Sequence, residues 1–162
     1  MARKPNPEEN PIEAKSDYVI EKEFVELLDD RFTNYAFAVM EDRALPNARD
    51  GLKPSQRRTL VAMDDLNLRS SGKTKKCAKI CGDVSGNYHP HGEAVVYPTL
   101  VRMAQDWSLR YPLIHPQGNF GSPSPDDKAA AMRYTEAKFS SFGDQMVAEL
   151  SNQVVNYVSN YN

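Results

Sequence analysis

The sequence predicts an α+β fold that is mainly α, and three observations lead to this prediction. Five segments carry the apolar spacing or the terminal residues of helices. Two of these helices are joined by a short turn inside a basic region, which is typical of a helix-turn-helix. From Arg110 onward the chain is rich in Gly, Pro and Ser, and short runs there indicate strands or a wing. With 162 residues and near-average apolar and charged fractions, the chain can form one domain with extensions.

The N-terminal part, residues 1–42, is expected to be an arm followed by an amphipathic helix. Residues 1–16 are rich in Pro, Asn and Glu, which is typical of a disordered or extended segment. From about residue 21 to residue 40, apolar residues recur at helical spacing. They are Phe24, Leu27, Leu28, Tyr35 and Val39.

A loop and a second helix are expected next. Pro46 and the pair Asp50-Gly51 mark the loop. The run KPS at residues 53–55 opens the helix, with Ser55 as its expected cap. The helix is predicted to end near Leu66.

The third and fourth helices form the helix-turn-helix candidate. The third is predicted over about residues 75–85, and Gly86 is well placed to end it. A tight turn at residues 88–92 leads to a fourth helix over about residues 93–105. Pro98 lies near the first turn of that helix, where proline is best tolerated.

The C-terminal third is expected to hold two short strands and a last helix. The runs YPLIH, residues 111–115, and AMRYTEAKF, residues 131–139, read as strands of a wing. The last helix is predicted over about residues 142–158. No internal repeat is evident.

The net charge of −2 conceals an uneven distribution of charge. Residues 1–42 carry 5 Lys or Arg against 11 Asp or Glu, whereas residues 43–138 carry 15 against 9. An acidic leading segment therefore precedes a basic middle, which is where a polyanion could bind. Scattered, solvated charge is the alternative interpretation.

The location of the protein is expected to be cytoplasmic, without membrane contact. No apolar run approaches the roughly 20 residues that span a bilayer. The N-terminal sequence MARKPNPEENPIEAK also lacks the apolar stretch of a signal peptide.

Two cysteines and two histidines lie close together in the sequence. Cys77 and Cys81 do not suggest a disulfide framework. With His89 and His91 they give the pattern C-x3-C-x7-H-x-H, whose spacing is wrong for common zinc sites. Histidines facing a phosphate backbone are the favoured interpretation, since imidazole can donate to a phosphate oxygen. Two turn histidines without a role remain the alternative.

Basic residues cluster in two places. The clusters are Arg57 and Arg58, and Lys73, Lys75, Lys76 and Lys79. Clustered Lys and Arg favour DNA through release of counterions, without base contacts. A surface that only keeps the protein in solution is the alternative.

Tyr134, which follows Arg133, is a candidate nucleophile. A phenol has a pKa near 10 and is mostly neutral at pH 7, so it needs a nearby cation, a general base or a metal. Arg133 is the adjacent cation. If the segment is a strand, however, neighbouring side chains point to opposite faces. The dipeptide alone therefore favours an ordinary strand residue.

Four longer motifs resemble the A subunits of bacterial DNA gyrase and topoisomerase IV. They are RALPNARDGLKPSQRR (43–58), GNYHPHGEAVVYPTLVRMAQ (86–105), QGNFGS (117–122) and AAMRYTEAKF (130–139). The resemblance is collinear from about Phe24 to the C-terminus. It implies a winged-helix DNA-cleavage domain of the type IIA topoisomerases over residues 43–141. It also implies that residues 142–162 lead toward a tower domain that this sequence lacks.

The resemblance implies a reaction and its partners. Tyr134 would attack a DNA phosphodiester, giving a 5′-phosphotyrosyl link and a free 3′-hydroxyl. Mg²⁺ and ATP would be held by a B-type subunit, in an A2B2 assembly on double-stranded DNA. No metal is expected on this chain. Without the tower, the fragment is expected to be inactive alone and to bind DNA weakly; a non-catalytic winged-helix DNA-binding fragment is the alternative.

The resemblance also assigns roles to individual residues. Arg133 matches the arginine that assists the nucleophile, and His89 and Arg43 match residues that line the cleavage centre. The matching DNA-backbone set is Lys53, Arg57, Arg58, His91 and Arg102.

Some positions depart from the family pattern. Where the family carries Ser and Asp or Glu to anchor a water–Mg²⁺ bridge to quinolones, this chain has Ala94 and Pro98, so resistance is expected. The loop 122–128 and the pair His115-Pro116 also differ. The small side chains of residues 129–131 are expected to let DNA or another backbone approach closely.

Overall fold

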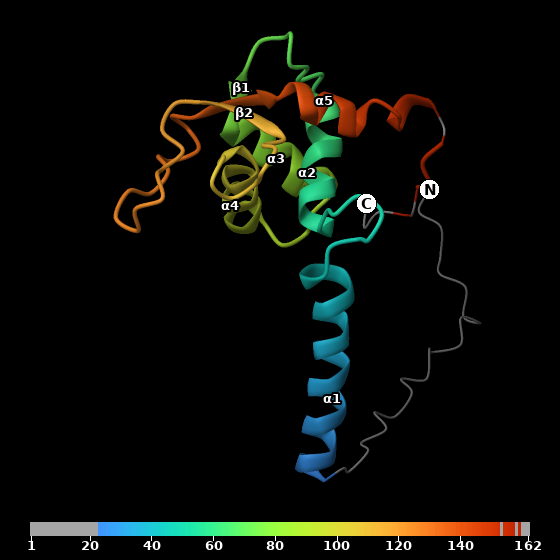
Figure 1. Cartoon of the computed structure of the whole chain (residues 1–162). Helices are drawn as coiled ribbons and strands as arrows, with labels where there is room; N and C mark the ends of the chain where they lie inside the picture. Colours follow the sequence, from blue (N-terminus) through green and yellow to red (C-terminus); the bar gives the residue numbers. More distant parts are fainter. Residues whose placement is uncertain (1–22, 153, 158, 160–162) are drawn as a thin grey trace, which may run out of the picture. The chain divides into compact units, whose positions relative to one another are not determined.

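The computed structural model describes residues 23–152, 154–157 and 159, and the chain divides into two units (Figure 1). One unit ends at Ala38 and the other begins at Val39. The arm expected over residues 1–16 lies outside the described residues. Among the helices of the described part, none is long and apolar enough to cross a membrane.

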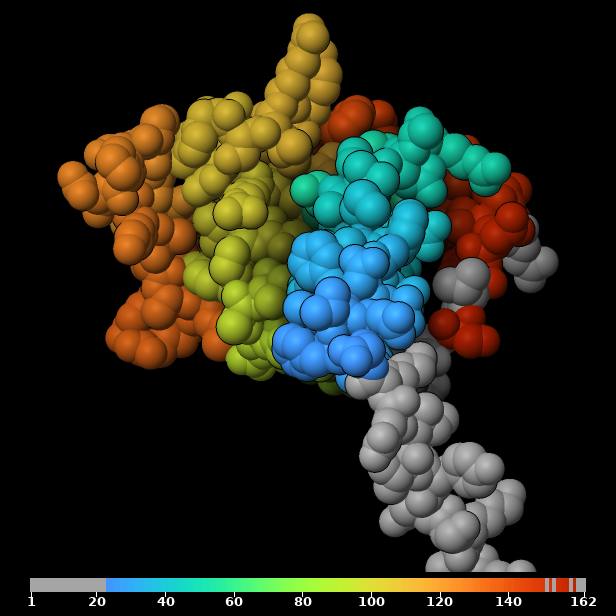
Figure 2. Space-filling model, turned by 90° about the horizontal axis from the view of Figure 1, so that it is seen from below, coloured from blue at the N-terminus to red at the C-terminus, as the bar shows by residue number. Residues whose placement is uncertain are grey.

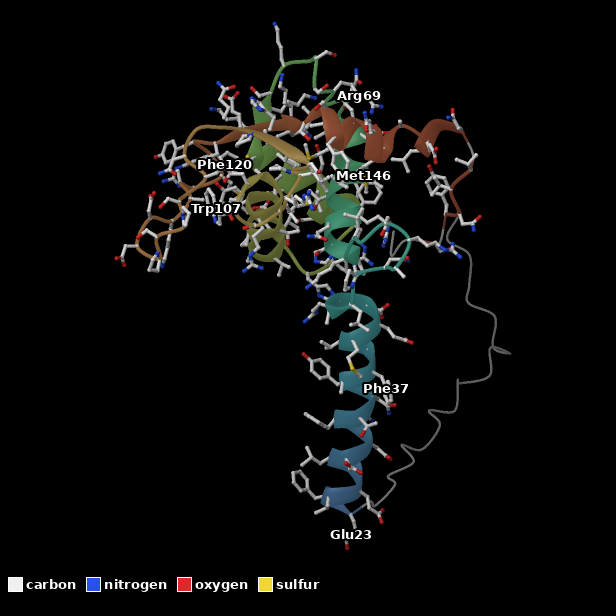
Figure 3. All side chains as sticks on the ribbon, viewed as in Figure 1. Glu23, Phe37, Arg69, Trp107, Phe120 and Met146 are labelled. Atoms are coloured by element: carbon white, nitrogen blue, oxygen red, sulfur yellow. The ribbon has the colours of Figure 1, made fainter. Side chains whose placement is uncertain are left out.

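The first unit contains helix α1, Phe24–Val39, except for its last residue, and this helix confirms the one expected over residues 21–40. None of its residues is buried. Its apolar side chains stand out as sticks along the helix in Figure 3, where Phe37 is labelled; Phe24 and Val25 are each 72 % exposed.

The second unit begins with a short π-helical turn, η1, Met40–Ala44, and a loop, and then has a core of three helices. These are α2, Pro54–Asp65; α3, Cys77–Asn87; and α4, Glu93–Ala104. Each of the three contacts the other two. Their largest fully buried side chains include Met63, Ile80, Val84, Leu100 and Met103. Burial of such apolar surface is the main stabilising contribution to a core of this kind.

Helix α2 begins at Pro54, two residues earlier than a cap at Ser55 would allow. The backbone N–H of Lys53 donates to Gln56 Oε1 at 2.9 Å, so the glutamine side chain folds back on the helix start. Ser55 lies inside the helix, where its carbonyl accepts from the Thr59 hydroxyl at 2.8 Å. The prediction of a Ser55 cap is therefore wrong, because Pro54 already occupies the first helical position.

Helix α3 differs from the prediction at both ends. Lys75–Lys76 forms strand β1 instead of the first helical turn, because both residues pair with a later strand. The helix then continues through Gly86 to Asn87, so Gly86 does not end it. Helix α4 ends within one residue of its prediction. Pro98 is internal to it and has no N–H to donate to the Ala94 carbonyl one turn earlier.

A three-stranded antiparallel sheet in the order β1-β3-β2 accompanies the helices (Figure 1). Strand β2 is Ile114–Gln117 and strand β3 is Glu136–Phe139. Ile114 pairs with Phe139 and both are buried, which joins the sheet to the core. Two late strands are thus present, but β2 begins three residues later than predicted and continues past residue 115 to Gln117. Strand β3 is shorter than predicted, and Tyr134 precedes it.

The expected long last helix is wrong. The structure has α5, Ser141–Val147, and a 3-10 turn, η2, Leu150–Asn152, and residues 154–157 are not helical. Ser140 caps α5, since its Oγ accepts from the Gly143 N–H at 3.0 Å. The sequence SNQVVNYVSN beyond it is rich in Asn, Ser and Val, which favour helices poorly.

The fold is therefore α+β and mainly α, as predicted. The segment between β2 and β3, coloured orange, extends from one edge of the second unit in the space-filling view (Figure 2). Phe120 of this segment lines a pocket together with Trp107 and Ile114. Phe120 and Trp107 are labelled in Figure 3. This segment leads to Tyr134.

Candidate functional site

Tyr134 lies in a turn at residues 132–134 and not in a strand. Its N–H donates to the Ala131 carbonyl at 2.9 Å, and its side chain is 64 % exposed. The Arg133 Cζ atom lies 4.6 Å from the centre of the Tyr134 ring, a cation–π contact. The alternation rule of strands therefore does not apply, and the two side chains do converge.

The first residues of α3 hold this turn through backbone hydrogen bonds. The N–H of Cys77 donates to the Thr135 carbonyl at 2.9 Å, and the N–H of Ala78 donates to the Met132 carbonyl at 3.1 Å. The first N–H groups of a helix have no partner within the helix, so they are free to hold another segment. Here they hold the residues on either side of Arg133 and Tyr134.

Two residues that the sequence did not single out also bind this segment. The Tyr97 hydroxyl of α4 donates to the Ala130 carbonyl and lies 2.9 Å from Thr135 Oγ1. Thr135 is fully buried. Because 33 and 38 residues separate these partners in the sequence, no local pattern reports the contact.

A second Arg-Tyr pair occurs in the chain. Arg110 Cζ lies 5.5 Å from the centre of the Tyr111 ring, and this ring also packs against Phe142 with centres 5.4 Å apart. An exposed arginine on an exposed tyrosine is therefore not by itself a mark of a reactive site.

His89 forms the centre of a basic group on the helical side of the second unit. It is only 7 % exposed, and its Nδ1 lies 2.9 Å from Arg58 Nη1. A guanidinium can only donate, so Nδ1 accepts and the neutral ring carries its proton on Nε2. Nε2 is buried and has no hydrogen-bond partner among the described residues.

The charge around His89 favours that neutral form. Burial is the largest cause that lowers the pKa of His89. The positive charges of Arg58, His91 and Arg43 act in the same direction. The His91 ring stands edge-on to the His89 ring, with centres 5.1 Å apart. An imidazole N–H beside three cationic or polar groups suits an anionic oxygen such as that of a phosphate.

The predicted backbone-binding residues are not equally available. Arg57 is held by Asp50, with Nη2 2.8 Å from Oδ1 and 2.7 Å from Oδ2. Burial alone would raise the pKa of Asp50, but hydrogen bonds from Arg57 and the Leu52 N–H lower it overall. Arg57 therefore shapes the loop before α2. Lys53 at the start of α2 is exposed.

The positions near the ends of α4 are open. Arg102 in its last turn is exposed, as are Ala94 and Pro98 near its start. Neither Ala94 nor Pro98 carries a side-chain group that could bind water.

The lysine cluster is largely used within the fold. Lys76 Nζ lies 2.8 Å from Glu136 Oε1, and Lys79 Nζ lies 2.7 Å from Asp83 Oδ1. Lys75 Nζ donates to the Leu66 carbonyl at 3.1 Å. This cluster offers a polyanion fewer free charges than the sequence predicts.

The zinc interpretation finds no support in the structure. Cys77 and Cys81 are buried inside the core, and burial raises the pKa of Cys81 to about 12. His89 already binds Arg58 through Nδ1. In the part of the chain that the structure describes, no group of three or more His, Cys, Asp or Glu residues could hold a metal ion.

Another part of the backbone, residues 119–121, lies close to residues 129–131. This agrees with the expectation that the small side chains let a backbone approach. The N–H of Ala130 donates to the Asn119 carbonyl at 3.0 Å. A Cβ atom at Gly121 would come within 3.1 Å of the Ala129 nitrogen, and Gly121 has a φ of +82°. Ala131 is exposed and the other two alanines are half-buried, so none of the three is fully buried. Approach of DNA stays a prediction.

The predicted site residues thus form two groups in the second unit. One is the Arg133–Tyr134 turn, and the other gathers Arg43, Arg58 and His91 around His89. Among the described residues, no hydrogen bond, ion pair or ring contact joins Tyr134 to the histidine group.

Comparison with known proteins identifies the family. A sequence model described as that of the DNA gyrase/topoisomerase IV A subunit matches residues 43–162, which include both groups. The chain belongs to this family. It is 54 % identical to the DNA gyrase A subunit of Chlamydia muridarum over 147 residues, which is 91 % of this chain and 18 % of the relative.

Further gyrase A relatives agree. The DNA gyrase A subunit of Treponema pallidum is 54 % identical over 130 residues, 80 % of this chain and 16 % of the relative. That of Borreliella burgdorferi is 52 % identical over the same length, with the same coverage. The chain therefore spans less than a fifth of the length of these gyrase A relatives.

Proposed function

We propose that this chain is the DNA-cleaving tyrosine region of a type IIA topoisomerase with a winged-helix arrangement. The observation that carries the proposal is the turn that α3 and α4 hold by hydrogen bonds, from which Tyr134 is exposed with the Arg133 guanidinium over its ring. Membership of the gyrase/topoisomerase IV A family supports it, because residues 43–162 include this turn.

In the proposed reaction, the Tyr134 oxygen attacks a phosphorus atom of the DNA backbone. A bond forms between the tyrosine oxygen and phosphorus, and the bond from phosphorus to the 3′ oxygen breaks. The phenol proton leaves to a base, and the 3′ oxygen takes up a proton. One phosphoester replaces another, so the reverse reaction reseals the strand without an external energy source.

Arg133 and the histidine group supply complementary charges. Arg133 stabilises negative charge that develops on the phenol oxygen and the phosphate. Arg43 and the Nε2–H of His89 bind a backbone phosphate, while Arg58 keeps that proton on Nε2. Because no contact among the described residues joins the two groups, we propose that a second copy of the chain brings its histidine group to the Tyr134 turn.

The proposed partners follow from the same family. The substrate is double-stranded DNA, bound in part through Lys53, His91 and Arg102. A B-type subunit holds Mg²⁺, which stabilises charge on the leaving oxygen, and also holds ATP. The exposed apolar side of α1 packs on that subunit in the proposed A2B2 assembly.

Covalent capture tests the proposal. The chain is mixed with a B-type subunit, Mg²⁺ and a nicked duplex, and the mixture is denatured and examined for a protein–DNA adduct. We expect an adduct with the wild type and with Tyr111→Phe, and none with Tyr134→Phe. An adduct that persists in Tyr134→Phe places the nucleophile elsewhere. No adduct with any variant supports a binding-only fragment.

A further inference from the structure

The segment that carries Tyr134 is tied to α4 by a buried chain of hydroxyl groups. We propose that Tyr97 and Thr135 act as a clamp that positions the Tyr134 nucleophile. This role rests on the proposed function of Tyr134. Neither residue touches the reacting atoms in the proposal, so both are positioning residues.

The directions of the hydrogen bonds follow from simple donor and acceptor rules. The Ala130 carbonyl can only accept, so the single hydroxyl proton of Tyr97 points to it. Thr135 Oγ1, 2.9 Å away, must then donate its proton to the Tyr97 oxygen. The Cys77 thiol also interacts with the side chain of Thr135. The hydroxyl protons of Tyr97 and Thr135 thus each have one defined acceptor, the Ala130 carbonyl and the Tyr97 oxygen.

Burial makes the clamp specific. Thr135 and Cys77 are fully buried, and Tyr97 is half-buried. Water cannot readily replace these partners, so loss of one hydroxyl leaves a buried polar group without its partner. Burial also raises the pKa of both the Cys77 thiol and the Tyr97 phenol, and this keeps the Tyr97 hydroxyl protonated as the donor to the Ala130 carbonyl.

The clamp joins the two ends of a short segment. Tyr97 binds the segment at Ala130, before the Tyr134 turn, and at Thr135, directly after it. Two N–H groups at the start of α3 hold the same segment. One binds the Met132 carbonyl, which lies between Ala130 and Thr135, and the other binds the carbonyl of Thr135 itself. Only Arg133 and Tyr134 extend from this frame into solvent as large side chains.

Such a frame matters for a displacement at phosphorus. The attacking oxygen must lie close to the phosphorus atom and in line with the leaving oxygen, and a 1 Å error can cost about 10²-fold in rate. A tyrosine in an exposed turn has no packing of its own to fix it. The clamp supplies that constraint from the buried side and leaves the hydroxyl of Tyr134 free.

The test compares hydroxyl deletions in the assembly with Mg²⁺ and the B-type subunit. Tyr97→Phe and Thr135→Val remove one hydroxyl each, and Thr135→Ser keeps it. Tyr111→Phe is the matched control, because it removes an exposed tyrosine hydroxyl outside the segment. Adduct formation at saturating nicked DNA, DNA affinity, and hydrogen exchange of the amides of residues 130–135 are measured.

We expect Tyr97→Phe and Thr135→Val to slow adduct formation at saturating DNA by about tenfold or more, with DNA affinity changed by less than about twofold. Exchange of the segment's amides should quicken. Thr135→Ser should restore both, and Tyr111→Phe should change neither. A merely structural role would not separate the rate from DNA affinity in this way.

Two results overturn the clamp. One is a normal adduct rate in Tyr97→Phe while Tyr134→Phe is inactive, and the other is unchanged exchange over residues 130–135. Failure of the wild type to form an adduct, or persistence of the adduct in Tyr134→Phe, instead overturns the proposed function on which the clamp rests. If Tyr97→Phe does not fold, Thr135→Val against Thr135→Ser decides the matter.

Discussion

The two Arg-Tyr pairs of this chain look alike at close range and differ in what holds them. Arg133 lies 4.6 Å from the Tyr134 ring and Arg110 lies 5.5 Å from the Tyr111 ring, and the tyrosines are 64 % and 58 % exposed. Tyr111 packs sideways on Phe142. Tyr134 instead lies in a turn that α3 holds through backbone hydrogen bonds and α4 holds through partly buried ones.

A charged neighbour therefore does not distinguish a candidate nucleophile from an ordinary surface tyrosine. Both pairs provide a cation over a phenol ring. Only one pair has a frame that restricts the backbone beneath the phenol while its hydroxyl remains open to a large substrate. Preorganised geometry of this kind is what an in-line displacement requires.

The two pairs should differ most in how the loss of their arginine changes the rate of DNA cleavage. Arg133→Gln should reduce the rate of adduct formation by about 10²–10³-fold, because it removes a cation that stabilises developing negative charge. Rates are measured by quenching the assembled enzyme on nicked DNA at successive times.

Arg110→Gln is the matched control for this experiment. It removes an equally exposed arginine from the other pair, and the adduct rate should stay within about twofold of the wild type. Equal losses in both variants would show that general DNA attraction, and not the contact with Tyr134, is responsible.

Part of the fold and of the candidate site could be predicted from the sequence. Helical spacing predicted α1 and α4 closely, and the longer motifs pointed to Tyr134. Local rules placed Tyr134 in a strand, yet the strand begins only at Glu136, because pairing with β1 and β2 sets its start. Register of this kind depends on partners about 20 to 60 residues away in the sequence.

Other misses have the same origin. Lys75 and Lys76 left the predicted helix because β3 offered them pairing partners. Tyr97 and Thr135 carry no sequence signal, since their contact spans 38 residues. Arg57 looked free in the sequence, but Asp50 folds back to bind it. The sequence thus indicated which residues could act, whereas the partners of their side chains could be identified only in the folded structure.

A smaller effect than that of Arg133 is expected at two positions of α4, Ala94 and Pro98. Quinolone-stabilised cleavage should be weak, because Ala94 and Pro98 lack side-chain oxygens that could hold a water–Mg²⁺ bridge. Ala94→Ser combined with Pro98→Asp should lower the drug concentration that traps half of the adduct by about tenfold, as expected for regained hydrogen bonds to ordered water. The adduct is measured across a drug titration.

The control for the drug experiment is the adduct level without drug, which the double substitution should leave close to that of the wild type. Strong trapping by ordinary drug concentrations in the unsubstituted enzyme would contradict the prediction. Since Pro98→Asp also returns a backbone N–H to α4, Pro98→Ala separates the effect of the backbone from that of the carboxylate.

The smallest expected effect is on the pH dependence of stability and concerns His89. This buried histidine is proposed to act together with the Arg133–Tyr134 pair and not with the Arg110–Tyr111 pair. The pKa of His89 is lowered, chiefly by burial, so the unfolded chain takes up a proton at a higher pH than the folded chain. The folded state is therefore favoured above the ordinary pKa of about 6.5, and this advantage is lost as the pH falls from there through the lowered pKa. The midpoint temperature of unfolding should decrease over that window, by about 2–4 °C for each kcal/mol lost.

His89→Gln keeps an acceptor for Arg58 but cannot titrate, so its unfolding temperature should vary less with pH below 6.5 than that of the wild type. His115→Gln removes an exposed histidine of β2 and should retain the wild-type dependence. If His89→Gln and the wild type follow parallel curves from pH 7 to pH 5, the neutral imidazole is not held by its burial beside Arg58. The proposed phosphate donor at Nε2 would then lose its physical basis, and the two Arg-Tyr pairs would differ only in their backbone support.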